Sequence, residues 1–279
     1  MDFEKISSRQ NPRVRRIFGL RERAARVESG LFLIEGMREL ERAAANGVEF
    51  AEFCFCPELM RSPLAQKIFA SARERLAPSA IFELSRPAFE KISYRERPEG
   101  VLAVARARPH TLAALPSETK GGAAPLFLVA ESVEKPGNLG ALARVADSAG
   151  CSALVCCGDA GTDVHNPNAI RASQGTLFSV PVAVASAREV RDWLFARGVT
   201  IFATAPAAEK IYWECDFRVP AAILMGTEAT GLSDFWIGEK NADSRVVPVA
   251  IPQLGAADSL NVSTAASICL FEAVRQRSL

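Results

Sequence analysis

The sequence of 279 residues is poor in the side chains from which metal sites and many nucleophilic sites are built. It contains only two histidines, His110 and His165, and its seven cysteines are scattered, several of them inside apolar runs, with no Cys-x-x-Cys pair. A zinc site of cysteine and histidine ligands is therefore not expected. Because free buried thiols are ordinary in a reducing compartment, the cysteine pattern predicts a cytoplasmic protein.

Long hydrophobic runs are also lacking. No apolar stretch approaches the roughly 20 residues of a membrane-spanning helix, and the charged residues 1–5 are not followed by the apolar segment of a secretory signal. We therefore expect neither membrane association nor a secretory leader. With 49% apolar and 23% charged residues, the composition is that of an ordinary folded protein.

The net charge of +1 says little about partners until it is resolved along the chain. Residues 1–27 carry eight lysines and arginines and three acidic residues, so their local charge is eight minus three, or +5. Such a segment can attract phosphate groups. A charged run is also the ordinary composition of a solvated helix face, so charge alone leaves both interpretations open.

Strand and helix patterns alternate on either side of a linker, which predicts two α/β domains. The predicted elements of residues 1–108 are strands at 31–34, 50–56, 81–84 and 101–105 and helices at 37–45 and 63–75. Residues 109–125 have the proline, glycine and serine content of a linker. The predicted elements of residues 126–279 are strands at 126–130, 153–157, 200–204, 221–225 and 246–249 and helices at 139–148, 187–196 and 261–275. These later strands are continuously apolar, which indicates a parallel sheet buried on both faces.

Ligands of such sheets bind at the carboxyl ends of the strands, and three common motifs are absent there. The sequence has no Gly-x-Gly-x-x-Gly dinucleotide fingerprint, no Gly-x-x-x-x-Gly-Lys-[Ser/Thr] phosphate loop and no Gly-x-Ser-x-Gly hydrolase elbow. Their absence argues against one rival interpretation, a dehydrogenase or another unrelated nucleotide-binding α/β enzyme.

Three other segments, residues 131–144, 225–232 and 251–263, do follow predicted strands. Each segment alone has an ordinary structural explanation: a capped helix start, a tight glycine turn or, for Arg144, an ion pair with Asp147 on the same helix. Their order and their shared position at strand ends favour a common site.

In this order, the three segments resemble the three motifs of the SpoU–TrmH family of RNA 2′-O-methyltransferases, in the SPOUT superfamily. The family's Asn-Leu-Gly-x-x-x-Arg pattern is matched by Asn138, Leu139, Gly140 and Arg144. Its Gly-[Ser/Thr]-Glu-x-x-Gly pattern is matched by Gly226, Thr227, Glu228 and Gly231. Its third pattern, Ile-Pro followed by a short loop and Ser-Leu-Asn-Val-Ser, is matched by Ile251, Pro252 and residues 259–263.

Two positions depart from the family's pattern. Lys135 stands where the family commonly has aspartate, which puts in doubt how the first loop is held, and Ala229 stands where it often has glycine. Residues 171–175, Arg-Ala-Ser-Gln-Gly, resemble a further family segment. The family has an N-terminal substrate-binding domain, which is similar to a ribosomal-protein fold that binds kinked RNA. This chain resembles that domain at residues 6–12, 32–36 and 97–101.

The resemblance implies an α/β fold with a parallel-sheet catalytic domain at residues 126–279, knotted into a trefoil near its C-terminal end. A smaller α/β RNA-binding domain is implied at residues 1–108. The implied reaction transfers a methyl group from S-adenosyl-L-methionine to a ribose 2′-hydroxyl of RNA, ribosomal RNA rather than tRNA, by a homodimer without a metal. The alternatives within the family are a tRNA enzyme and a non-catalytic RNA-binding module.

The resemblance also assigns roles to individual residues. The predicted catalytic residues are Arg144, Asn138, Glu228, Ser259 and Asn261. The predicted cofactor-binding residues are Met225, Gly226, Gly231, Ile251, Leu254, Leu260 and Asn261. The predicted RNA-binding residues are Arg9, Arg13, Arg16 and Arg171. The expected dimer has some support from apolar residues of the last helix, namely Val262, Ala265, Ile268, Cys269, Leu270 and Ala273.

No histidine lies in the three motifs, so the usual general base is missing. The resemblance gives the central role in catalysis to Arg144, with the RNA phosphate as a candidate second participant. Because an arginine is effectively always protonated, its use as a free base is costly. An equally consistent hypothesis is that Arg144 binds the adjacent phosphate and stabilises the developing alkoxide, and the sequence does not choose between the two.

Overall fold

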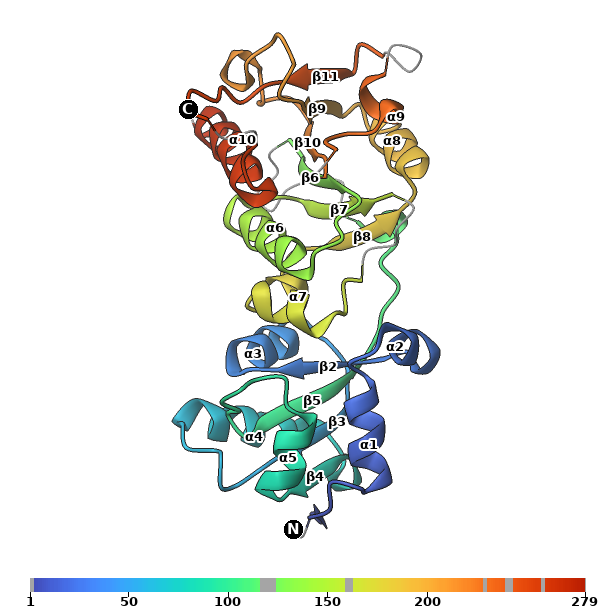
Figure 1. The fold of residues 1–279 in the computed structure, drawn as a ribbon, viewed down its shortest axis with the longest axis vertical. Helices are drawn as coiled ribbons and strands as arrows, with labels where there is room; N and C mark the ends of the chain where they lie inside the picture. Colours follow the sequence, from blue (N-terminus) through green and yellow to red (C-terminus); the bar gives the residue numbers. More distant parts are fainter. Residues whose placement is uncertain are drawn as a thin grey trace. The chain divides into compact units, whose positions relative to one another are not determined.

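The computed structural model describes residues 3–115, 124–158, 163–227, 230–238, 243–256 and 259–278. Packing divides the chain into two compact units (Figure 1). The first unit comprises Met1–Pro109 together with Asp163–Ser179, and the second comprises His110–Thr162 and Val180–Leu279. Each is an α/β structure built around its own sheet.

The first unit contains a five-stranded mixed sheet in the order β1-β4-β3-β5-β2. Strand β5 runs antiparallel to both of its neighbours, whereas β4 is parallel to β1 and β3. The strands are β1 (Glu4–Ile6), β2 (Leu31–Glu35), β3 (Phe50–Phe55), β4 (Ile81–Leu84) and β5 (Val101–Arg106). The helices are α1 (Pro12–Gly19), α2 (Arg23–Ser29), α3 (Met37–Ala45), α4 (Pro63–Arg75), α5 (Arg86–Ile92) and α7 (Pro167–Ala172), with short 3-10 turns η1 (Pro78–Ala80) and η3 (Thr176–Phe178).

Helices cover both faces of this sheet, because successive residues of a strand point to opposite sides. In β3, Cys54 belongs to the core that the sheet forms with α1 and α5. Its neighbours Phe53 and Phe55 contact the ring of Phe69 on α4 instead. Helix α1 begins at Pro12 because proline suits the first helical position, and the side chain of Asn11 accepts a hydrogen bond from the helix. The short elements β1, α1, α2 and α5 were not predicted from the sequence.

The segment Asp163–Ser179 packs with the first unit, although the sequence prediction placed it in the catalytic domain. The ring of Phe32 lies 4.4 Å from the ring of His165 and 6.2 Å from that of Phe178. A Cβ atom on Gly175, whose φ is +85°, would lie 2.9 Å from the Cα of Glu39. This contact leaves no room for a side chain at position 175.

The second unit contains a six-stranded sheet in the order β11-β9-β10-β6-β7-β8, and every strand pair in it is parallel. The prediction of a parallel sheet is therefore confirmed. The strands are β6 (Leu126–Glu131), β7 (Ala153–Cys157), β8 (Val182–Ala185), β9 (Thr200–Thr204), β10 (Ala221–Met225) and β11 (Val246–Val249). The helices are α6 (Pro136–Ser148), α8 (Ala187–Phe195), α9 (Asp234–Ile237) and α10 (Val262–Arg277), with 3-10 turns η2 (Leu112–Ala114) and η4 (Tyr212–Glu214).

Helices α6 and α10 pack together on one face of this sheet, and α8 and α9 cover the other (Figure 1). Strands β6, β7 and β10 are buried along their whole length, which explains their uninterrupted apolar sequences. None of the helices in the described ranges is both long enough and apolar enough to cross a membrane.

Part of the predicted linker is built into the second unit. The backbone amide of Val184 donates to the carbonyl oxygen of His110 at 3.1 Å, and Nδ1 of His110 lies 3.0 Å from the carbonyl oxygen of Val182. Leu115 is buried in the core of that unit. The rest of the predicted linker, up to residue 123, lies outside the described residues.

Two helix starts differ from the prediction. Helix α6 begins at Pro136 instead of residue 139, because proline fixes a helical φ and lacks the N–H that a first turn leaves unused. Helix α10 begins at Val262, with Asn261 as its N-cap. The trefoil knot expected in this region stays a prediction.

Candidate functional site

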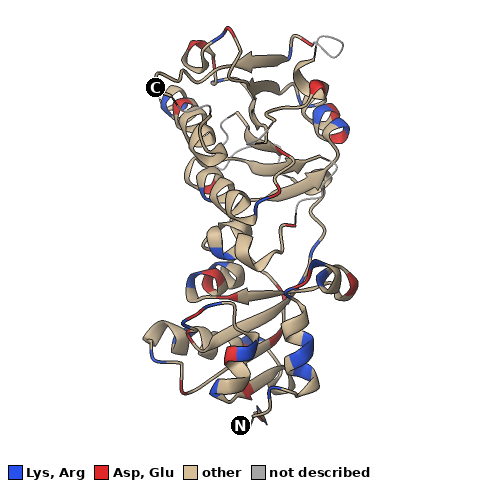
Figure 2. Ribbon diagram, in the orientation of Figure 1, with Lys and Arg blue, Asp and Glu red and all other residues tan. Residues whose placement is uncertain are grey.

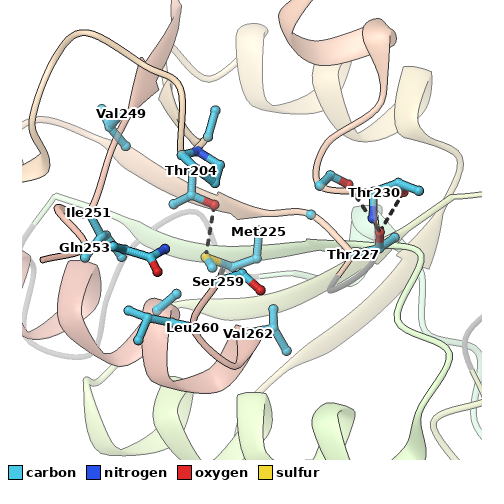
Figure 3. A pocket seen from close by; sticks show the side chains of 15 residues that line it. Thr204, Met225, Thr227, Thr230, Val249, Ile251, Gln253, Ser259, Leu260 and Val262 are labelled. Carbon is cyan, nitrogen blue, oxygen red and sulfur yellow. Dashed lines mark hydrogen bonds between the residues drawn. The ribbon is translucent and has the colours of Figure 1, made fainter. Parts of the chain in front are cut away.

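A cavity of about 350 Å³ opens at the carboxyl ends of β9, β10 and β11 in the second unit (Figure 3). This is the edge of a parallel sheet where ligands bind, and the volume suits a small molecule. None of the described lining residues carries a charge; they are Thr204, Ala205, Pro206, Met225, Gly226, Thr227, Thr230, Gly231, Val249, Ile251, Gln253, Ser259, Leu260, Val262 and Ala265.

Apolar side chains make up much of the wall. Figure 3 shows Ile251, Leu260 and Met225 around the cavity, with Thr227 and Thr230 toward one end. Met225 and Leu260 come from different motifs, at the end of β10 and just before α10. The arrangement suits a flat apolar ring system that also carries polar edges, because hydroxyl and amide groups border the apolar surface.

The loop after β10 forms a wall made of backbone. Its ends are joined by two hydrogen bonds, from the amide of Thr227 to the carbonyl of Gly231 at 3.0 Å and from the amide of Gly231 to the carbonyl of Thr227 at 3.2 Å. A Cβ atom on Gly226 would lie 2.3 Å from the carbonyl carbon of Gly231. Glycine is therefore required at position 226 for the loop to close in this way.

A second hollow of about 220 Å³ adjoins the cavity. The two share Gly226, Thr227, Thr230 and Val262 among their lining residues. The second hollow differs in having charged residues in its lining; its other described lining residues are Glu131, Ser132, Val133, Glu134, Lys135 and Asn138. A cavity with an uncharged lining and a hollow with a partly charged lining thus meet at the loop after β10.

The carboxylate of Glu131, at the end of β6, connects this loop region to the centre of the sheet. Glu131 is 6% exposed. It accepts hydrogen bonds from the amide of Ser233 at 2.9 Å, from the Ser233 hydroxyl at 2.7 Å and from Nε1 of Trp236 at 3.0 Å. Three donors therefore compensate the burial of one carboxylate.

The first and third motifs also meet. Nδ2 of Asn261 donates to Oδ1 of Asn138 at 3.4 Å. Oδ1 of Asn261 accepts from the amide of Ser263 at 3.0 Å and from its hydroxyl at 2.6 Å, which caps α10. One asparagine thus fixes a helix start and contacts the other motif.

Arg144 lies exposed on α6. Within the described part of the chain, the structure gives Arg144 no hydrogen-bond or ion-pair partner. An exposed arginine that is not neutralised by the protein is able to receive an anionic ligand.

The structure brings most of the predicted site residues together. Met225, Gly226, Gly231, Ile251, Ser259 and Leu260 line the cavity, Asn138 lines the second hollow, and Asn261 contacts Asn138. Leu254 is 100% exposed and does not line the cavity, although it was predicted to bind the cofactor. Glu228 lies outside the described residues.

The four arginines predicted to bind RNA all lie in the first unit. Two of them are neutralised there. Arg13 forms an ion pair with Glu4 at 3.1 Å, and Arg16 forms one with Glu52 at 2.5 Å. Arg171 is exposed on α7, and Nε of Arg9 donates to a backbone carbonyl at 3.0 Å.

Sequence reasoning missed the cavity wall at the end of β9, made by Thr204, Ala205 and Pro206. The available signal was a buried strand followed by a turn. It could not be used, because the sequence does not reveal that β9 is the neighbour of β10 in the sheet.

The cysteines of this unit are not poised as nucleophiles. Burial raises the pKa of the Cys151 and Cys269 thiols to about 12, and it also raises the pKa of Cys157 at the end of β7. A buried thiol with a raised pKa is a poor nucleophile near neutral pH. All seven cysteines of the chain lie outside disulfides.

Comparison with known proteins agrees with this geometry. The model of the SpoU rRNA Methylase family matches residues 125–271, and that of the MRM3-like substrate binding domain matches residues 11–103. The chain is 32% identical over 267 residues to a 23S rRNA (uridine(2479)-2′-O)-methyltransferase of Streptomyces viridochromogenes, covering 92% of this chain and 87% of that protein.

Solved structures show the same architecture over nearly the whole chain. A structure of an RNA 2′-O ribose methyltransferase superposes with a TM-score of 0.81 at 40% identity, covering 99% of this chain and 100% of the other. An AdoMet-bound rRNA methyltransferase from Sinorhizobium meliloti superposes with a TM-score of 0.84 at 28% identity, covering 98% of each chain. The chain belongs to the SpoU rRNA methylase family.

Proposed function

We propose that this protein transfers a methyl group from S-adenosyl-L-methionine to a ribose 2′-hydroxyl of ribosomal RNA. The observation that carries the proposal is the pair of adjoining hollows at the carboxyl edge of the second sheet. One has the volume and lining for the donor, and the other offers polar groups for the acceptor. The family match and the relatives' activity on 23S rRNA support the choice of substrate.

The residues present fit the donor. A Cβ atom on Gly226 would clash with the backbone of Gly231, so backbone atoms themselves line this wall. Met225, Ile251 and Leu260 offer an apolar surface for the adenine ring, and backbone groups and hydroxyls beside it can bind the ribose and the amino-acid part. When bound there, S-adenosyl-L-methionine supplies an activated methyl group whose transfer leaves a neutral thioether.

Four residues from the first and third motifs serve the acceptor. Asn138, which lines the second hollow, and Asn261, which contacts Asn138, orient the ribose, and Ser259 lines the donor cavity. Arg144 binds the RNA phosphate next to the reacting hydroxyl and stabilises the negative charge that develops on the oxygen as its proton passes to solvent water. Glu228 stays a predicted participant of the second motif.

The protein acts as a homodimer in this proposal. The apolar residues of α10 that suggested a dimer are largely used within the unit: Val262, Cys269, Leu270 and Ala273 are buried there. Phe271 on the same helix is 49% exposed, and Trp213 on η4, which packs against α10, is 52% exposed. Two large exposed apolar side chains on elements that pack together suit a surface covered by a second copy.

The reaction takes place in the cytoplasm in this proposal. Its support is that all seven cysteines are buried outside disulfides, as expected in a reducing compartment.

The test is an incubation of the purified protein with S-adenosyl-L-methionine labelled on its methyl group and, separately, unmodified ribosomal RNA and tRNA. We expect label in a 2′-O-methylated nucleoside from ribosomal RNA. Label only in tRNA would contradict the substrate, and label on a base would contradict the acceptor atom. Donor binding without any transfer to naked RNA or to ribosomal particles would favour a non-catalytic RNA-binding module.

A further inference from the structure

A hollow of about 450 Å³ lies on the first unit, remote in sequence from the three motifs. It is lined by Arg9, Gln10, Arg15, Phe18 and Lys91. Helices α1 and α5, which carry Arg15, Phe18 and Lys91, pack against each other on one face of the sheet (Figure 1). Three cations, one amide and one aromatic ring line this space, and none of its described lining residues is acidic.

No ion pair with the described residues neutralises the positive charges of the hollow. Nζ of Lys91 lies 3.8 Å from the ring centroid of Phe18, and the guanidinium of Arg21 lies 4.6 Å from it. Nε of Arg9 donates to a neutral backbone carbonyl. Arg15 has no ion-pair partner among the residues that the structure describes, so the charge stays available to a ligand.

The other basic residues of α1 differ in this respect. Arg13 pairs with Glu4 and lies over the ring of Phe82, and Arg16 pairs with Glu52. Residues three apart share a helix face, so Arg15 lies on the side of Phe18. Figure 2 shows the concentration of basic residues on α1. The basic N-terminal segment is therefore divided into a neutralised part and a free part.

We infer that this hollow binds a backbone phosphate of the RNA substrate, an inference that rests on the methyltransferase function proposed above. A phosphodiester offers several acceptor oxygens and one negative charge. Arginine binds such a group through paired N–H donors, lysine binds it as a point charge, and the Gln10 amide adds a neutral donor. Contacts of this kind fix the register of an RNA without reading its sequence.

Phe18 serves as a support in this arrangement. Its ring is already in contact with the cationic groups of Lys91 and Arg21, so it orients lysine toward the phosphate instead of stacking on a base. Lys91 and Arg15 are thus RNA-binding residues that the charge of the N-terminal segment alone did not single out.

The test compares two double variants of the full-length protein that each remove one arginine and one lysine. Arg15→Gln with Lys91→Gln changes the hollow. Arg61→Gln with Lys67→Gln changes cations at the start of α4, on the opposite face of the sheet. Binding of unmodified 23S rRNA is measured by filter retention over a series of KCl concentrations.

We expect the hollow variant to bind the RNA at least about tenfold more weakly. The slope of the logarithm of the binding constant against the logarithm of salt concentration becomes shallower by about 0.7–0.9 for each RNA phosphate that the variant no longer binds. The control variant keeps both the affinity and the slope of the wild type. A charge-conserving variant, Arg15→Lys with Lys91→Arg, retains most of the affinity and shows that the hollow variant is not merely misfolded.

An unchanged affinity of the hollow variant, or an equal loss in the control variant, would overturn the inference. The proposed function is tested separately by methyl transfer from the labelled donor at saturating RNA. If the wild type binds the RNA but transfers no methyl group, the proposed function fails, and the binding comparison still decides the role of the hollow. Competition by inorganic phosphate at concentrations far below those of salt would indicate a site for the free anion and contradict the RNA assignment.

Discussion

Arg144 and Arg26 differ in burial and in the hydrogen bonds that their side chains form. Arg26 is 5% exposed, donates to the carbonyl oxygens of Leu20 and Arg21 and pairs with Asp163, all within the first unit. Such a buried guanidinium, whose two terminal nitrogens both donate hydrogen bonds, supports the fold. Arg144 is exposed and has none of these contacts within the described residues, which leaves it available for the reaction.

Replacement of Arg144 by alanine should lower kcat/KM for methyl transfer by about 10²–10³-fold, the usual loss when one stabilising donor is removed. Donor affinity, measured by calorimetry, should stay unchanged because Arg144 does not line the donor cavity. Arg144→Lys should restore only part of the activity, since lysine lacks the planar pair of donors. Near-normal turnover of the lysine variant would show that the guanidinium geometry is not needed.

At the scale of elements, hydrogen bonds of single side chains fix the positions of loops. The carboxylate of Glu131 holds the start of α9 to the end of β6 through three hydrogen bonds. Because the loop after β10 precedes α9 directly, Glu131 positions the wall shared by the two hollows.

Glu131→Gln should lower the free energy of unfolding by about 1–3 kcal/mol, because an amide replaces an acceptor of three donors and leaves at least one of them unsatisfied. We also expect weaker donor binding, with kcat at saturating donor less affected. Thermal unfolding and donor titration measure these effects. The neighbouring Glu134→Gln, at an exposed position, is the control and should change stability by less than about 0.5 kcal/mol. Equal effects of the two variants would contradict the positioning role.

His110, at the start of the second unit, makes the stability of the protein depend on pH. Burial lowers the pKa of His110 from its usual 6.5, so the unfolded state takes up the proton first. Its contribution to stability is present above about pH 6.5 and is lost as the pH falls toward the folded-state pKa. Between pH 7.5 and pH 5.5 we expect the wild type to lose about 1–3 °C more in Tm than His110→Asn, which keeps a donor for the Val182 carbonyl. Parallel losses would show that His110 does not cause the change.

At the scale of the whole molecule, the chain does not divide once, as a simple linker implies. It leaves the second unit after β7, contributes Asp163–Ser179 to the first, and returns to form β8. The assignment of RNA binding to one predicted domain and of catalysis to the other stays a prediction. Arg171 lies within residues 126–279, which the sequence analysis assigned to the catalytic domain. In the structure it packs with the first unit instead.

The proposed homodimer gives a whole-molecule prediction. Phe271→Glu places a charge on the exposed apolar surface of α10 and should convert a dimer into a monomer in sedimentation velocity measurements, because burying an unpaired charge is costly. Val27→Glu, at a 75% exposed position of the first unit, is the matched control and should leave the assembly unchanged. A monomeric wild type, or a dimer that tolerates Phe271→Glu, would contradict the proposed interface.

The sequence by itself determined the features that lie within short stretches of chain. Buried strands such as β6 and β10 were predictable from their continuous apolar residues, and Gly226, Ile251 and Leu260 from motifs that resemble those of a known family. Only the tertiary structure decided which strands are neighbours, and with that the wall at Thr204, the contact of Asn261 with Asn138 and the neutralised state of Arg13. The physical reason is that local propensity acts between near neighbours in the chain, whereas strand order and side-chain pairing depend on packing between residues far apart in sequence.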